Sequence, residues 1–102
     1  MPKRPRTVRR AASRDAAKMV HQKWKLAALE SGGAPARAIV VASASVVESH
    51  ARSLPCVLCD GTVRIDEHTV EEHDGARLRV ARVVCMRCGT PRALYFRIAQ
   101  PN

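Results

Sequence analysis

The residues of this chain best suited to chemistry are four cysteines in two Cys-x-x-Cys pairs. Cys56 and Cys59 lie in LPCVLCDGTV, and Cys85 and Cys88 lie in VVCMRCGTPR. Two residues between cysteines allow both sulfurs of a tight turn to point at one ion, while backbone amides donate hydrogen bonds to the thiolates. Together the four side chains offer the closed tetrahedral set of a structural zinc site. We therefore expect one structural Zn²⁺ with no open position for a substrate.

The residues around each pair favour a metal-binding turn. Gly89 directly follows the second pair and supplies the positive φ that such a turn requires. Asp60 stands at that place in the first pair, where it tolerates the left-handed region, and Gly61 follows it. One Zn²⁺ and four thiolates leave a local negative charge, which gives Arg87 and Arg92 a physical reason to lie nearby.

Other roles for the thiols stay open. An iron centre of the rubredoxin type also accepts four thiolates. Two disulfides are disfavoured because the chain has no secretory signal, and thiols stay reduced in the cytosol. A thioredoxin-like redox pair would need a βαβ setting around a single Cys-x-x-Cys. Metal binding is therefore the leading interpretation.

Strand-like segments surround the cysteines. TVRIDEHTVE and RLRVARVV are separated by EHDGA, whose Asp-Gly is a hairpin signal, and ALYFRI follows the second pair. The pattern C-x2-C-x25-C-x2-C, with a hairpin inside it and a strand after it, resembles the zinc-ribbon family over residues 54–98. The resemblance implies a three-stranded antiparallel zinc ribbon. The predicted fold class is a small metal-bound α+β domain, in which a disordered arm and a basic amphipathic helix precede the ribbon.

The N-terminal third is predicted to be an arm and a helix. Residues 1–12 are rich in arginine and proline and have little to bury, so we expect a disordered basic arm. Residues 13–31 are predicted to be helical, with Ser13 as N-cap, Asp15 in the first turn and SGG as the stop signal. An apolar stripe at three- and four-residue spacing is expected to pack on the domain; it comprises Ala16, Met19, Val20, Trp24 and Ala27.

A linker over residues 32–53 joins this helix to the ribbon. Its β-branched segment at 38–43 predicts a short strand. Ser45 and Glu48 fit a capping box, which predicts a brief helical turn. The zinc ribbon is expected to occupy residues 54–100.

Charge is concentrated at the N-terminal end. Residues 1–37 hold ten Lys and Arg against two acids, a net of +8, whereas residues 38–102 hold eight Arg against seven acids, a net of +1. This asymmetry favours a polyanionic partner, with a solubilising tail as the alternative. The candidate nucleic-acid contacts in this region are Lys3, Arg4, Arg6, Arg9, Arg10, Arg14 and Lys18.

Alternation assigns two faces to the predicted sheet. The inner face is expected to hold Val63, Ile65, Leu78, Val80, Leu94 and Phe96, covered by the helix stripe. The outer face is expected to hold Arg64, Arg77, Arg79, Tyr95 and Arg97, of which the last four are further candidate nucleic-acid contacts. The alternative is a solvated face on which Arg64, Arg77 and Arg79 pair across strands with Asp66 and Glu71.

The acidic hairpin is similar in one respect to transcript-cleavage elongation factors, whose zinc-ribbon hairpin carries an Asp-Glu pair that helps to hold a metal. The chain has Asp66-Glu67 and Glu71-Glu72. The basic residue that precedes the acidic pair in that family is not matched, and Asp66-Glu67 lies well before the Asp-Gly turn. We expect these acids to be solvated.

The remaining polar residues suggest no second site. His68 and His73 are five residues apart on a strand, so they point to opposite faces, and both are expected at the surface. No apolar run approaches the roughly 18 residues of a membrane span. The composition is that of a bacterial protein from a GC-rich genome, and we expect a cytoplasmic location.

The sequence therefore predicts a non-catalytic zinc-binding module. We expect its basic N-terminal region to associate with nucleic acid or with a ribonucleoprotein or transcription complex. A basic arm ahead of two Cys-x-x-Cys turns is similar to zinc-ribbon ribosomal proteins of the bacterial large subunit, which have a much shorter gap between the pairs. The alternative is a protein–protein adaptor whose ribbon docks on a larger machine. No nucleophile–base pair, open metal site or phosphate loop suggests an enzyme or a small-molecule substrate.

Overall fold

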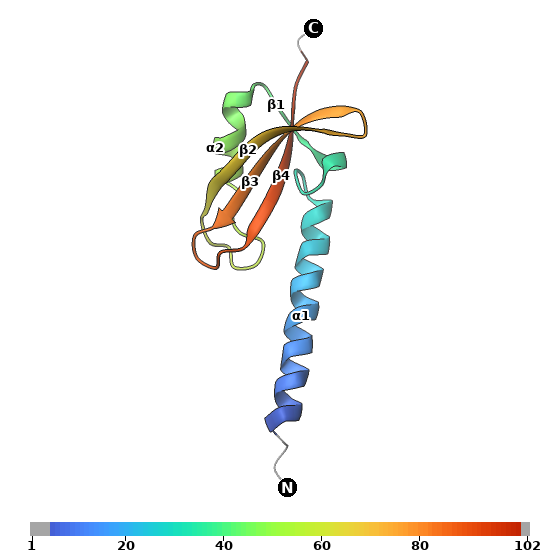
Figure 1. Ribbon diagram of the computed structural model, residues 1–102, viewed down its shortest axis with the longest axis vertical. Coiled ribbons are helices and arrows are strands. Elements are labelled where there is room, and N and C mark those ends of the chain that lie inside the picture. Colours follow the sequence, from blue (N-terminus) through green and yellow to red (C-terminus); the bar gives the residue numbers. More distant parts are fainter. Residues whose placement is uncertain (1–4, 101–102) are drawn as a thin grey trace.

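A small four-stranded sheet carries a short helix on one face, and a long N-terminal helix extends away from it (Figure 1). The computed structural model describes residues 5–100. In chain order, the elements are α1 (Pro5–Leu29), a 3-10 turn (Pro35–Arg37), β1 (Ile39–Val41), α2 (Ala44–Arg52), β2 (Val63–His73), β3 (Ala76–Cys85) and β4 (Pro91–Ile98).

The sheet has four strands in the order β1-β4-β3-β2 and is mixed. The expected three-stranded antiparallel ribbon is therefore wrong. β2, β3 and β4 are antiparallel neighbours, but β1 adds to the outer edge of β4 in the parallel direction, with Ile39 opposite Phe96 and Val41 opposite Ile98. The linker strand becomes part of the sheet because its apolar residues continue the buried surface of β4.

The β2–β3 hairpin turns at Asp74 and Gly75, whose φ angles of 51° and 81° are both positive. Two consecutive positive φ angles are typical of the type I′ turn, which suits the twist of a two-residue hairpin and favours Asp-Gly. A β-bulge leaves Asp66 without a partner between the Ile65 and Glu67 pairs. The bulge changes which residues of β2 share a face.

The main core lies between α2 and one face of the sheet. Val47 and Ala51 of α2 are fully buried, as are Leu94 and Phe96 of β4. The ring of His50 on α2 meets Phe96 edge-on, with centroids 5.6 Å apart. Short aliphatic side chains and one phenylalanine therefore supply the apolar burial that stabilises the domain.

The second face of the sheet differs from the sequence prediction. Leu94 is opposite Ala81, so Leu94 and Ala81 share the α2 face, while Val80 points to the other side with Tyr95. Val80 and Ala81 are both 0% exposed, which means that β3 is buried on both faces. The single inner face containing both Val80 and Leu94 is wrong, because alternation along β3 cannot identify one buried face.

Helix α1 also differs from its prediction. It begins at Pro5, well before Ser13, because proline fits the first turn of a helix and the Ala- and Arg-rich segment favours helix formation. Residues 5–12 are therefore helical and do not form a disordered arm. The stripe does not cover the sheet: Met19 is 60% exposed, and only Trp24 and Ala27 of the stripe are even partly buried.

The start of α2 is not a capping box. Its N-cap is Ser43, whose hydroxyl lies 2.8 Å from that of Ser45 and makes no hydrogen bond to the backbone of the first turn. Glu48 turns toward the sheet instead, where its carboxylate lies 3.1 Å from Nδ1 of His68. This contact ties α2 to β2.

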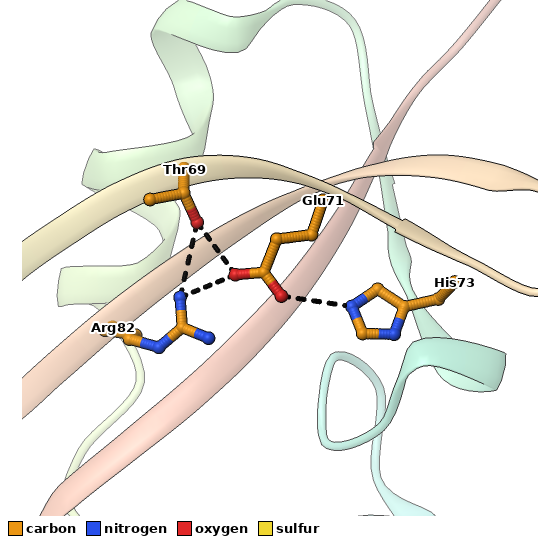
Figure 2. Close-up of polar contacts among 4 residues, drawn as sticks. All are labelled: Thr69, Glu71, His73 and Arg82. Atoms are coloured by element: carbon orange, nitrogen blue, oxygen red, sulfur yellow. Dashed lines mark hydrogen bonds and ion pairs between the residues drawn. The ribbon is translucent and has the colours of Figure 1, made fainter.

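A polar network occupies the sheet face opposite α2 (Figure 2). Arg82 donates to Glu71 at 2.7 Å and to Thr69 at 3.2 Å, Thr69 donates to the same Glu71 oxygen at 2.9 Å, and His73 Nε2 lies 3.2 Å from the other oxygen. The His73 ring also meets Tyr95 edge-on at 5.5 Å. The hydrogen bond from Arg82, followed by those from Thr69 and His73, lowers the pKa of Glu71 from 4.5 to about 2.

The lowered pKa of Glu71 predicts a defined pH dependence. Its carboxylate should stabilise the fold fully above about pH 4.5, and this contribution should decline as the pH falls toward about 2. In an NMR titration, the Glu71 carboxyl carbon should keep its ionised shift over the whole pH range in which the chain stays folded. Arg82→Gln should raise the pKa of Glu71 toward its ordinary value of 4.5, and Arg64→Gln should leave that pKa unchanged. Ordinary titration of Glu71 in the wild-type chain would contradict the network.

Candidate metal centre

The two cysteine pairs lie in two turns that the sheet brings together. The first turn connects α2 to β2, and the second connects β3 to β4. Val63, at the start of β2, pairs with Cys85 at the end of β3, and Met86 N–H donates to Thr62 O at 2.8 Å. Pairing of β2 with β3 therefore places the first turn directly against the second.

The two turns have the same backbone hydrogen bonds. In the first, Asp60 N–H donates to Cys56 O and Cys56 N–H donates to Gly61 O, both at 2.9 Å. In the second, Gly89 N–H donates to Cys85 O and Cys85 N–H donates to Thr90 O, again at 2.9 Å. Each turn thus presents its two sulfurs in an equivalent way.

The four sulfurs form one cluster. All lie within 4.8 Å of one another; Cys56 and Cys88 are separated by 3.7 Å, and Cys59 and Cys85 by 3.5 Å. A tetrahedral site with Zn–S bonds of about 2.3 Å needs sulfurs about 3.8 Å apart. All four cysteines are free thiols. The geometry is consistent with a zinc-binding site, and the four side chains could hold one metal ion.

Hydrogen bonds and crowding shift the thiol pKa values in opposite directions. The Thr90 side chain and backbone lower the pKa of Cys88 to about 6, and backbone N–H groups of Cys88 and Arg87 lower that of Cys85. At Cys59, the backbone of Gly61 favours the thiolate, but the neighbouring thiols and desolvation outweigh it and raise the pKa to about 12. Four adjacent thiolates repel one another, so a bound cation is what would allow all of them to ionise together.

The turn residues fit the cluster closely. Asp60 and Gly89 have positive φ angles of 59° and 76°, as the sequence predicts for the residue after each pair. Gly61 is needed for space, since a Cβ there would lie 2.9 Å from the sulfur of Cys85 and 3.1 Å from that of Cys59. A residue larger than glycine at position 61 would therefore collide with the sulfurs.

Cationic side chains surround the turns. Arg87 Nη1 lies 3.4 Å from Cys59 O, and the half-buried Arg92 lines the same cavity as Cys56. Burial lowers the pKa of Arg92, although the charges of Glu30 and Cys56 oppose that change. Sequence reasoning missed Lys23, whose ammonium donates to Leu58 O at 3.0 Å and joins α1 to the first turn. No sequence pattern connects a lysine and a carbonyl 35 residues apart.

The candidate nucleic-acid contacts do not form one surface. Lys3 and Arg4 lie outside the described residues, and Arg6 lies in the first turns of α1. Arg9, Arg10, Arg14 and Lys18 are exposed along α1. On the sheet, Arg79 is opposite Phe96 and shares the α2 face with Arg77, whereas Tyr95 and Arg97 lie on the other face with Arg64. The expected single arginine-rich outer face is therefore wrong.

The two acidic pairs of the hairpin differ in position: Asp66-Glu67 lies well before the tip, whereas one residue separates Glu72 from the Asp74-Gly75 turn. Asp66 is the bulge residue, and its carboxylate forms an ion pair with the Arg64 guanidinium at 3.4 Å. Both side chains are more than half exposed. Glu71 is held in the network of Figure 2.

The two strand histidines point to opposite faces, as predicted, but neither is a fully exposed surface residue. His68 contacts Glu48 with its side chain 15% exposed, and His73 contacts Glu71 with its side chain 29% exposed. Within residues 5–100, the four cysteines are the one cluster of three or more metal-ligating side chains. No helix in this part of the chain is long and apolar enough to cross a membrane.

Comparisons of this chain with protein-family models, with curated proteins and with solved structures give no match.

Gly61→Ala is expected to weaken metal binding without removing a ligand. The added methyl group would press on two sulfurs, and changes beside metal ligands commonly reduce affinity about ten- to hundredfold. Affinity can be measured by competition with a chromophoric chelator. Asp60→Gly is the matched control, because glycine adopts the same positive φ freely. Wild-type affinity in Gly61→Ala would contradict this packing around the sulfurs.

Proposed function

We propose that this protein is a non-catalytic module in which one structural zinc ion folds a ribbon-like sheet and helix α1 associates with nucleic acid or a nucleoprotein complex. Four thiolates complete a tetrahedral coordination shell, which is the ligand set of structural zinc and leaves no position for a substrate. The resemblance of the cysteine spacing to zinc ribbons supports the same choice. Iron of the rubredoxin type is the alternative metal, and elemental analysis separates the two.

The observation that carries the nucleic-acid proposal is the isolation of α1. Its 25 residues correspond to a helix about 37 Å long, most of which extends from the sheet into solvent (Figure 1). Arg10, Arg14 and Lys18 follow one another at four-residue spacing, so their charges lie along one side of the helix. A line of exposed cations on a rigid support suits a polyanion, because phosphate contacts gain affinity by releasing counterions.

A protein–protein adaptor is the second candidate. Four large apolar side chains of α1 are exposed: Met19 at 60%, Val20 at 41%, Leu26 at 63% and Leu29 at 60%. A helix with an apolar side can dock in a hydrophobic groove of a partner. The two functions make different demands on α1, since one uses its cations and the other its apolar residues.

Neutralising the helix is expected to reduce the salt dependence of nucleic-acid binding. In Arg10→Gln/Arg14→Gln/Lys18→Gln, the slope of log affinity against log salt should fall by about two to three, with roughly one unit lost per phosphate contact. Fluorescence anisotropy with labelled single-stranded and duplex nucleic acids at several salt concentrations measures it. The charge-matched control is Arg37→Gln/Arg52→Gln/Arg64→Gln, whose side chains are exposed outside α1.

An unchanged slope in the helix variant would contradict the proposal. If Met19→Gln instead abolished capture of a single protein partner that survives nuclease treatment, the adaptor function would replace it.

A further inference from the structure

A cleft opens where β4 diverges from β3. The pairing of β3 with β4 ends at Arg79 opposite Phe96, after which the C-terminal end of β4 continues beside β1 while the β2–β3 hairpin extends away. The cleft has a volume of about 520 Å³ and is lined by the start of β3 and by the segment from Arg97 to Gln100. The segments that line it, the start of β3 and the end of β4, are at the opposite end of the molecule from the start of α1 (Figure 1).

Three guanidinium-bearing residues line this cleft: Arg77, Arg79 and Arg97. Arg79 is half-buried, whereas Arg77 and Arg97 are exposed. Within residues 5–100, none of the three has a carboxylate oxygen within 4 Å; the ion pairs involve other residues. Glu72, the partner of Arg77 in strand register, is the acid placed nearest by pairing. The described residues that line the cleft therefore include three arginines and no acid, and the one acid opposite them in register forms no ion pair with them.

Backbone N–H and C=O groups without a strand partner also border the cleft. Ala76, Arg77 and Leu78 pair with β2 but have no partner on β4, so the groups of this segment that point toward β4 are left open to the cleft. Phosphate oxygens accept hydrogen bonds from backbone N–H groups as well as from side chains. Guanidinium groups match phosphate oxygens in a two-pronged geometry that lysine cannot provide.

We propose that the cleft formed by Arg77, Arg79 and Arg97 is a phosphate-binding site that receives the backbone of a nucleic acid. The choice of a nucleic acid over a free phosphate compound rests on the proposed function of α1. The site is distinct from α1 in residues and position. By register, Arg77 and Arg79 border the cleft from the α2 face of the sheet and Arg97 borders it from the other face, so an anion in the cleft would have cationic residues on both sides. A strand that contacts both regions is held at the two ends of the molecule.

The direct test is NMR of the zinc-loaded full chain, monitoring the side-chain Nε–Hε signals of Arg77, Arg79 and Arg97. Pyrophosphate is added first, and a single-stranded RNA of roughly 20 nucleotides is added separately and in competition. Both should shift the three signals in a saturable way and compete with each other. Arg77→Gln/Arg79→Gln/Arg97→Gln should weaken RNA binding about tenfold at moderate salt and lower the salt slope by about two. The Arg37/Arg52/Arg64 control should do neither.

The variants separate this site from the function of α1. In the α1 variant Arg10→Gln/Arg14→Gln/Lys18→Gln, the cleft signals should still respond to pyrophosphate, so a failure of the α1 proposal leaves the anion site measurable. Arg97→Gln alone, at an exposed position, replaces the triple variant if the latter fails to fold. Absence of saturable shifts with either probe overturns the site. Saturation by pyrophosphate that RNA does not displace, or binding of an acidic peptide but not RNA, overturns the assignment to a nucleic-acid backbone.

Discussion

Four sulfurs held within 4.8 Å of one another are the constraint on which the rest of this structure depends. Their negative charges would repel if all were ionised, and a cation at the centre would allow all four to ionise together. The sulfurs come from two turns, one between α2 and β2 and one between β3 and β4, and pairing of Val63 with Cys85 sets these turns side by side. A bound ion would therefore link the end of α2, the start of β2 and the β3–β4 connection in a single step. Because the core contains few large side chains, such a link would have a substantial effect on stability.

Burial of the core does not depend on most of α1. The metal turns, α2 and the sheet satisfy one another, so α1 is not required to cover the core. It joins the domain mainly through Trp24, Ala27 and the contact of Lys23 with Leu58, all near its C-terminal end. The rest of the helix is free to present its charges. The arginine cleft is likewise built at the margin of the sheet, where strand pairing stops and backbone donors become accessible.

Local signals predicted the parts of the structure that depend on local chemistry. The cysteine spacing identified the four clustered side chains, and Asp74-Gly75 identified the hairpin because its two positive φ angles favour those residue types. The short segment at 38–43 was recognised as a strand, but its parallel partner was not, since three residues carry no information about pairing. The predicted start of helix α1 was too late. Ser13 and Asp15 are residue types typical of a helix start, but the helix begins at Pro5.

Alternation of apolar and polar residues could not predict which side chains share a face of the sheet. β3 is buried on both sides, with Val80 and Ala81 both inaccessible, so its sequence does not say which apolar residues lie with Leu94. The register of β3 against β4, across the turn that contains Cys85 and Cys88, sets which side chains share a face. It puts Arg79 opposite Phe96 and on the same face as Phe96, not on the face of Tyr95. The same register brings Arg79 into the cleft with Arg77 and Arg97. Long-range contacts such as Lys23 with Leu58 are set by the finished fold.

Metal content is the most direct test of the central claim. Native mass spectrometry and elemental analysis of the purified full chain should find one zinc ion per molecule, with all four cysteines protected from alkylation until a chelator removes the metal. A metal-free chain that is lighter by the four hydrogens lost in forming two disulfides would contradict the account.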